Sequence, residues 1–96
     1  MPAYIIGRLQ MRDPSWLEKY RATVPSLVAK HRGTYRVRGG KMETLEGNTP
    51  LPSSFVVLEF PTMERAKEWL NCEEYREPRK MRHRTAKTNM IVVEGV

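Results

Sequence analysis

Charged side chains lie inside segments that otherwise have the apolar pattern of β-strands, and they are the first candidates for ligand binding or proton transfer. Glu59 lies in an apolar run, and Arg8 lies in another. A carboxylate among apolar strand residues either pairs with an arginine or is hard to ionise because burial disfavours its charge. Either state suits ligand binding or proton transfer. We therefore expect Glu59 to move a proton, with an Arg–Glu pair that ties two subunits together as the structural alternative.

Arg38 stands directly before the pair Gly39-Gly40. A guanidinium group offers a two-pronged donor to a carboxylate, and glycines let a ligand approach the backbone closely. We expect Arg38 and Arg8 to hold the carboxylate or enolate of a ligand. Alternation within the strands places both of them, with Glu59, on the face of the sheet that the helices leave bare.

His31 lies at the end of a predicted helix, where it either caps the last carbonyl groups or serves as a second proton carrier. Trp16 and Trp69 occupy helical positions, and packing in the core or an interface is their expected role. The sequence has no dinucleotide-binding, P-loop, zinc-protease, serine-hydrolase or C-x-x-C motif. It therefore predicts neither a metal site nor a cofactor.

Composition limits the classes of protein to which the chain can belong. The 96 residues include 17 Lys plus Arg against 11 Asp plus Glu, a formal charge of +6, and one cysteine. This length predicts one domain, 1–96, with a thin core. The absence of an internal disulfide, a signal peptide or a long apolar run predicts a cytoplasmic protein with no membrane partner.

The positive charge is concentrated in two stretches that contain no acidic residue. They run from 30 to 41 and from 79 to 87, and the second includes Arg82. A region of one sign favours an anionic partner, although basic side chains also serve solubility.

Alternation and helical spacing predict the elements that must position these residues. Asp13-Pro14 and Thr62 have the character of helix starts, and Gly33 that of a helix end. The predicted strands are Ala3–Met11, Thr34–Arg38 with a continuation over Met42–Leu45, Phe55–Phe60 and Thr88–Glu94. The predicted helices are 14–32, a second that begins after Thr62, and Glu73–Thr85, which Pro78 is expected to interrupt.

The order strand, helix, strand, strand, helix, strand predicts an α+β, ferredoxin-like fold. Its four-stranded antiparallel sheet has the helices on one face. Tyr4, Ile6, Phe55 and Val57 would then point away from the helices and form an exposed apolar patch. A second copy of the chain is the simplest cover, so we predict a homodimer.

Several segments resemble a bacterial family, the domain of unknown function 1330. They are Tyr20–Pro25, His31–Gly33, Val37–Gly40 and Val57–Pro61, with Ala66, Trp69 and Tyr75. The resemblance implies the dimeric α+β barrel superfamily, whose members include cofactor-free monooxygenases and lactone isomerases. It directs attention to the matched positions Tyr20, His31, Arg38, Gly40 and Glu59. Arg32 replaces an expected glycine, and Pro78 falls where relatives keep a continuous helix.

Together these observations predict a homodimer that binds a small anionic organic ligand, either as a binding protein or as a cofactor-independent enzyme that transfers a proton. Arg8, Tyr20, Arg38 and Gly40 are the expected substrate-binding residues, and Glu59 and His31 the expected catalytic residues. The alternatives are a single-stranded nucleic-acid-binding module and a non-catalytic assembly protein. The nucleic-acid reading is disfavoured because Glu59 would face the bases or phosphates.

Overall fold

A single four-stranded antiparallel sheet forms one layer of the molecule. The computed structural model describes all residues 1–96. The strands are β1 (Ala3–Met11), β2 (Thr34–Arg38), β3 (Ser54–Phe60) and β4 (Ala86–Glu94). They lie side by side in the order β2-β3-β1-β4. This order confirms the predicted ferredoxin-like α+β fold.

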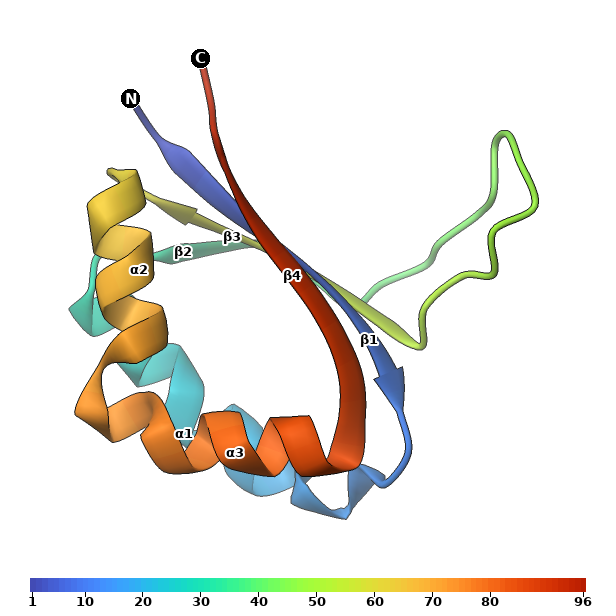
Figure 1. Cartoon of the computed structure of the whole chain (residues 1–96), viewed down its shortest axis with the longest axis horizontal. Coiled ribbons are helices and arrows are strands. Elements are labelled where there is room, and N and C mark those ends of the chain that lie inside the picture. The colour runs from blue at the N-terminus through green and yellow to red at the C-terminus, as the bar shows by residue number, and fades with distance from the viewer.

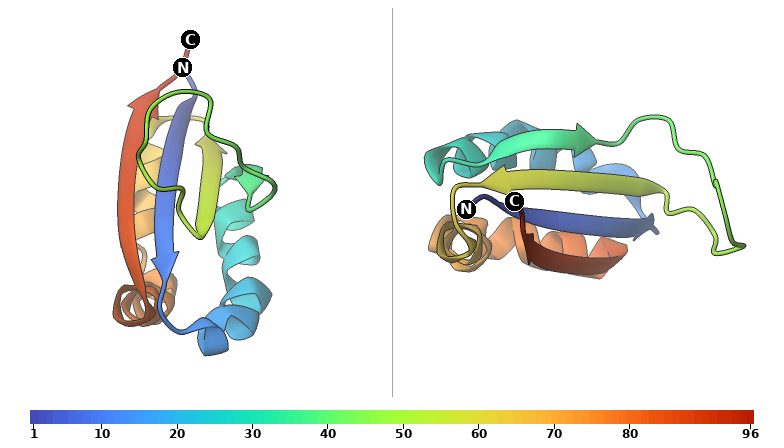
Figure 2. Two further views of the ribbon diagram at one scale, coloured as in Figure 1. Left: turned by 90° about the vertical axis from the view of Figure 1, so that its right-hand side faces the viewer. Right: turned by 90° about the horizontal axis from the view of Figure 1, so that it is seen from above.

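Three helices form the second layer, all on one face of the sheet (Figure 1). They are α1 (Leu17–Lys30), α2 (Met63–Asn71) and α3 (Arg76–Thr85), with short 3-10 turns at Pro14–Trp16 and Glu73–Tyr75. The loop 39–53 projects on the opposite side and passes in front of the bare face of the sheet (Figure 2, left). None of the helices has the length and apolar character needed to cross a membrane.

Two of the predicted helix starts are formed by side-chain caps. The Asp13 carboxylate accepts a hydrogen bond from the Ser15 amide at 3.0 Å. The Thr62 hydroxyl accepts one from the Arg65 amide at 3.1 Å. Each bond satisfies an amide that has no partner within its own helix, so both starts are encoded locally.

The end of α1 differs from the prediction in one residue. Gly33 was expected in the left-handed position, but Arg32 holds it, with φ 63°. The Arg32 amide donates to Ala29 and the Gly33 amide to Val28, which is the Schellman arrangement. Gly33 is needed for space instead, because a Cβ there would lie 2.7 Å from the Phe60 ring.

Pro78 does not interrupt a helix, contrary to the prediction for Glu73–Thr85. A 3-10 turn ends at Tyr75 and α3 begins at Arg76, so Pro78 is the third residue of the new helix. A proline in the first helical turn removes no hydrogen bond, since the amides there have no intrahelical partner. The strand predicted for Met42–Leu45 is also wrong, because those residues belong to the loop.

The main core lies between the sheet and the helices. Its members are nine buried residues, Ile5, Val24, Leu27, Val28, Leu58, Phe60, Ala66, Trp69 and Tyr75. Trp69 stacks on Tyr75 with ring centroids 4.4 Å apart and also packs against Phe60. A smaller cluster of Leu9, Trp16 and Ala86 continues the core toward the far end of the sheet.

A β-bulge in β2 changes the face on which Arg38 lies. Tyr35 pairs with Leu58, but two residues later Val37 pairs with Val57, so the register shifts by one. Arg38 then pairs with Val56 on the helix-facing side, whereas simple alternation had placed it on the bare face. An extra residue in a strand redirects every side chain that follows it.

Candidate functional site

A cavity of about 80 Å³ lies between the sheet and the helices. It runs beneath all four strands, from Tyr35 and Arg38 on β2, past Val56 and Leu9, to Met90 on β4. Helices and turns contribute Trp16, Leu17, Tyr20, Arg21, Pro25, Trp69 and Arg82. The wall contains three arginines but no Asp, Glu or His. It is therefore a positively charged site in an otherwise largely aromatic and apolar surround.

Arg82 is the buried arginine of this wall, with 3% of its surface exposed. Its guanidinium carbon lies 5.8 Å from the centre of the Tyr75 ring. Nη1 lies 3.8 Å from the Met90 sulfur and Nη2 3.5 Å from His83 Nε2, while Nε has no partner. Burial and the Arg82 charge lower the pKa of His83. No carboxylate compensates this buried charge, and such compensation is the usual condition for burying one.

Two indole groups of the same cavity wall also lack hydrogen-bond partners. Buried side-chain nitrogens and oxygens without a partner number four in this chain. Three of them belong to the cavity wall, Trp16 Nε1, Trp69 Nε1 and Arg82 Nε, and Thr88 Oγ1 is the fourth. All three cavity groups are donors only. An acceptor-rich ligand would satisfy them, whereas burying them unpaired costs free energy.

A pair of tyrosine hydroxyls crosses the same region. Tyr20 and Tyr75 are hydrogen-bonded through their hydroxyl oxygens. Burial raises the pKa of both phenols, far above the usual range for Tyr20, and each therefore stays protonated at neutral pH. The Trp16 ring meets Tyr20 edge-on at 5.0 Å and fixes its position. The pair thus offers the cavity a neutral hydroxyl donor rather than a base.

The mouth of the cavity lies between α1 and the end of β2. Arg21 and Pro25 line it from the helix, and Arg38 and Gly39 line it from the strand. The Arg38 guanidinium carbon lies 4.9 Å above the centre of the Tyr35 ring. Arg21 and Arg38 are exposed, and neither takes part in an ion pair.

Two of the six sequence-predicted site residues, Tyr20 and Arg38, lie in the cavity wall. Gly40 lies just beyond the mouth, with φ 96° and open space where a side chain would be. The other three residues have structural partners outside the cavity.

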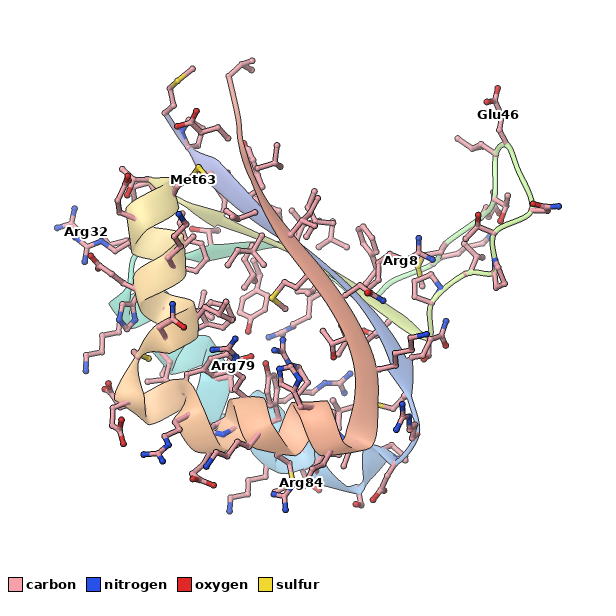
Figure 3. All side chains as sticks on the ribbon, viewed as in Figure 1. Arg8, Arg32, Glu46, Met63, Arg79 and Arg84 are labelled. Atoms are coloured by element: carbon pink, nitrogen blue, oxygen red, sulfur yellow. The ribbon has the colours of Figure 1, made fainter.

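Glu59 accepts a bond of 2.9 Å from Arg36 Nε on the bare face. Arg8 extends on the loop side of the sheet (Figure 3) and donates to the Pro50 carbonyl at 3.1 Å. His31 Nδ1 donates to the Leu27 carbonyl at 3.0 Å, as a cap of α1. The structure therefore does not bring the two predicted proton carriers to the predicted ligand-binding residues.

Sequence reasoning missed Arg82 as a site residue because it lies in a basic run that looks solvated. A signal was present, however. Within α3, Arg82 follows the half-buried Pro78 by four residues and precedes the half-buried Thr85 by three. That spacing puts the three residues on one side of the helix, so Arg82 lies on its inward face. Trp16 and Trp69 pack in the core as expected, and their indole nitrogens have no acceptor.

The fold and the site define a class, a ferredoxin-like α+β domain with a small cationic cavity between sheet and helices. The family model described as "Domain of unknown function (DUF1330)" matches residues 2–96. The chain belongs to this family, as the sequence resemblance predicted. Among curated proteins there is no match.

Solved structures share the fold at low sequence identity. A protein of unknown function from Rhodopseudomonas palustris is 17% identical with a TM-score of 0.79, covering 99% of this chain and 82% of that one. SnoaB, a cofactor-independent oxygenase from Streptomyces nogalater, is 11% identical with a TM-score of 0.68, covering 99% and 93%. A dimeric ferredoxin-like protein of unknown function from Bacteroides fragilis is 17% identical with a TM-score of 0.56, covering 98% and 96%.

Proposed function

We propose that the cavity binds a small organic anion whose carboxylate or enolate oxygens accept hydrogen bonds from Arg82 and the two indoles. One observation carries the proposal: three buried donors without partners line one cavity that contains no acidic side chain. An anion would neutralise the buried guanidinium and satisfy the donors together. Tyr20 adds a hydroxyl donor when the Tyr75 hydroxyl donates to it, and this phenol stays protonated because burial raises its pKa.

The chemistry that such a site supports is stabilisation of an enolate without a cofactor. Fixed N–H donors in a cavity closed to water hold developing negative charge on oxygen more strongly than water does. Glu59 and His31 lie outside the cavity, so we assign the hydroxyl of Tyr20, rather than either of them, to hold the proton nearest the ligand. SnoaB has the same fold, and its description as a cofactor-independent oxygenase agrees with this type of chemistry.

We propose that the protein acts as a homodimer formed through the bare face of the sheet. Ile91, Val93 and Val37 on this face are 61%, 43% and 38% exposed. The half-buried Ile6 pairs with Ile91 across β1 and β4 and connects these positions into a patch. Covering such a patch is favourable by roughly 25 cal/mol per Å² of apolar surface. The Bacteroides fragilis protein, which has the same fold, is dimeric.

The experiment that tests the binding site measures carboxylate affinity by isothermal titration calorimetry. Acetate, propionate and pyruvate are titrated into the wild type, Arg82→Gln and Arg84→Gln. Arg84 is an exposed arginine on the same helix (Figure 3) and serves as the matched control. We expect the Arg82→Gln change to weaken binding at least tenfold, since a charge-assisted hydrogen bond contributes about 1.5–3 kcal/mol.

Arg84→Gln should bind as the wild type does. Arg82→Lys, which keeps the charge, covers the case in which the glutamine variant does not fold, and it should retain part of the affinity. Absence of carboxylate binding in the wild type, or equal affinity in all variants, would contradict the proposed site.

A further inference from the structure

The three arginines of the cavity occupy two separate places. Arg82 is buried beneath β4, whereas Arg21 and Arg38 lie at the mouth beside β2. Neither location supplies an acidic partner, because no Asp or Glu lines the cavity. The inner and outer ends of one cavity therefore each present an uncompensated positive charge.

The bulge in β2 is what brings a charge to the outer end. Alternation from Tyr35 places Arg36 on the bare face, where Glu59 neutralises it at 2.9 Å, and the bulge then turns Arg38 to the cavity face. Arg38 lies over the Tyr35 ring, which positions the guanidinium, and it takes part in no ion pair. Arg36 therefore has an acidic partner within the protein, whereas Arg38, two residues later, has none.

The dimensions of the cavity limit what can connect the two ends. Its volume of about 80 Å³ is close to that of two or three liquid water molecules at about 30 Å³ each. The backbones of β2 and β4 are three strand spacings apart, roughly 14 Å at about 4.8 Å each, and arginine side chains enter from both sides. A ligand with one acidic group inside and another at the mouth must be short.

We propose that the ligand is a short dianion, such as an aliphatic dicarboxylate, with one acidic group on Arg82 and the second on Arg38, assisted by Arg21. The inference rests on the proposed anion-binding function and specifies its substrate class. Arg38 acts as the specificity-determining residue, because its planar fork can bind a carboxylate through two parallel hydrogen bonds. A monoacid of the same length would occupy the inner end only.

The test compares monoacids and diacids of equal carbon number: propionate with malonate, butyrate with succinate, and valerate with glutarate. Affinities are measured by isothermal titration calorimetry at constant ionic strength, because salt screens exposed charges. For at least one chain length we expect the wild type to bind the diacid at least tenfold more tightly. Arg38→Gln should remove this preference.

Arg36→Gln is the matched control, since it removes the same charge two residues away on the other face. It should keep the diacid preference. Arg38→Lys tests whether the preference needs the two parallel hydrogen bonds of the guanidinium or only its positive charge. Lysine keeps the charge but cannot form both bonds, so this variant should lose most of the diacid preference. Arg38 is exposed, so these variants are expected to fold.

The inference is overturned if monoacids and diacids bind the wild type equally. It is also overturned if the preference survives Arg38→Gln, or if Arg36→Gln lowers it as much. In each of those outcomes monoacids still bind, so the proposed anion site stands. If no acid of either kind binds, the proposed function itself fails, and the inference fails with it.

Discussion

The two faces of the sheet differ in whether their charged side chains have partners within the protein. On the bare face, Arg36 and Glu59 neutralise each other at 2.9 Å, and Arg8 donates to a backbone carbonyl of the loop. On the helix-facing side, Arg82 is almost fully buried and has no acidic partner, and two indole donors of the same cavity wall are also unpaired. The protein itself supplies the partners of the paired charges, whereas the proposed ligand would supply those of the buried donors.

The two faces also differ in how far their apolar side chains are buried. The helix-facing side packs closely outside the cavity, and Phe60, Trp69 and Tyr75 are buried there. The bare face leaves Ile91 and Val93 exposed on its edge strand. This difference supports our proposal that a small molecule binds on one face and a second copy of the chain on the other.

The largest expected effect comes from placing a charge on the bare face. Ile91→Asp should raise the dimer dissociation constant at least about a hundredfold, because two-fold symmetry buries the carboxylate twice, and an unpaired buried charge costs several kcal/mol. Sedimentation equilibrium at micromolar concentration measures it. Val96→Asp, at the fully exposed C-terminal residue, is the control and should stay dimeric. A monomeric wild type would contradict the assignment of this face.

Alkaline pH should destabilise the helix-facing side through its buried phenols. Burial raises the pKa of Tyr20 and Tyr75 above 10, so above pH 10 the folded state binds more protons than the unfolded one. Stability is then complete below pH 10 and falls as the pH rises, by up to about 1.4 kcal/mol per pH unit for each phenol.

Urea unfolding at pH 8, 10 and 11 tests this pH dependence. Tyr20→Phe should flatten the decline, because it removes one of the two buried phenols. Parallel curves for the wild type and Tyr20→Phe would show that Tyr20 ionises freely in the folded state.

Close packing beside the cavity makes Gly33 sensitive to a single methyl group. Gly33→Ala puts a Cβ 2.6 Å from a Val28 methyl and 2.7 Å from the Phe60 ring, and should cost about 1–3 kcal/mol of unfolding free energy. Gly47→Ala in the loop is the control: it meets no neighbour within 4 Å and only the strain of φ 83° remains. Equal losses for both variants in denaturant unfolding would mean that packing at Gly33 is loose.

The smallest expected effect is a gain of stability at Arg32. Arg32→Gly relieves the cost of a left-handed residue with a side chain, about 1–2 kcal/mol, but adds unfolded-state entropy, which offsets up to about 1 kcal/mol. The net gain should be below about 1 kcal/mol in urea unfolding, with carboxylate binding unchanged. A loss of stability would mean that the Arg32 side chain stabilises the fold.

The sequence predicted what depends on neighbours along the chain. Alternation located the strands, and the Asp13 and Thr62 caps marked two helix starts. The ferredoxin-like order followed from the sequence of elements. These features depend on local patterns of polarity and on side-chain groups within four residues of their partners.

The position of the site residues depends on how distant strands pair, and the alternation of residues within one strand does not reveal that pairing. The bulge that turns Arg38 inward is defined only by how β2 pairs with β3. Arg82 belongs to a basic run, and the sequence of such a run predicts either an anionic partner or a solvated surface without showing which side chain is buried. A charge is also expected at the surface by default, so a buried one is found only when the helical phase is known.

The stability of Arg82→Met, with and without a carboxylate, tests most directly the claim that Arg82 is held unpaired for a ligand. Methionine keeps an unbranched apolar side chain and removes the charge. Without ligand, Arg82→Met should be as stable as the wild type or more stable by about 1–3 kcal/mol, because a buried charge without a carboxylate is lost. Saturating succinate should stabilise the wild type in urea unfolding and leave Arg82→Met unchanged. A marked loss of stability in Arg82→Met, together with equal stabilisation of both proteins by succinate, would contradict the account.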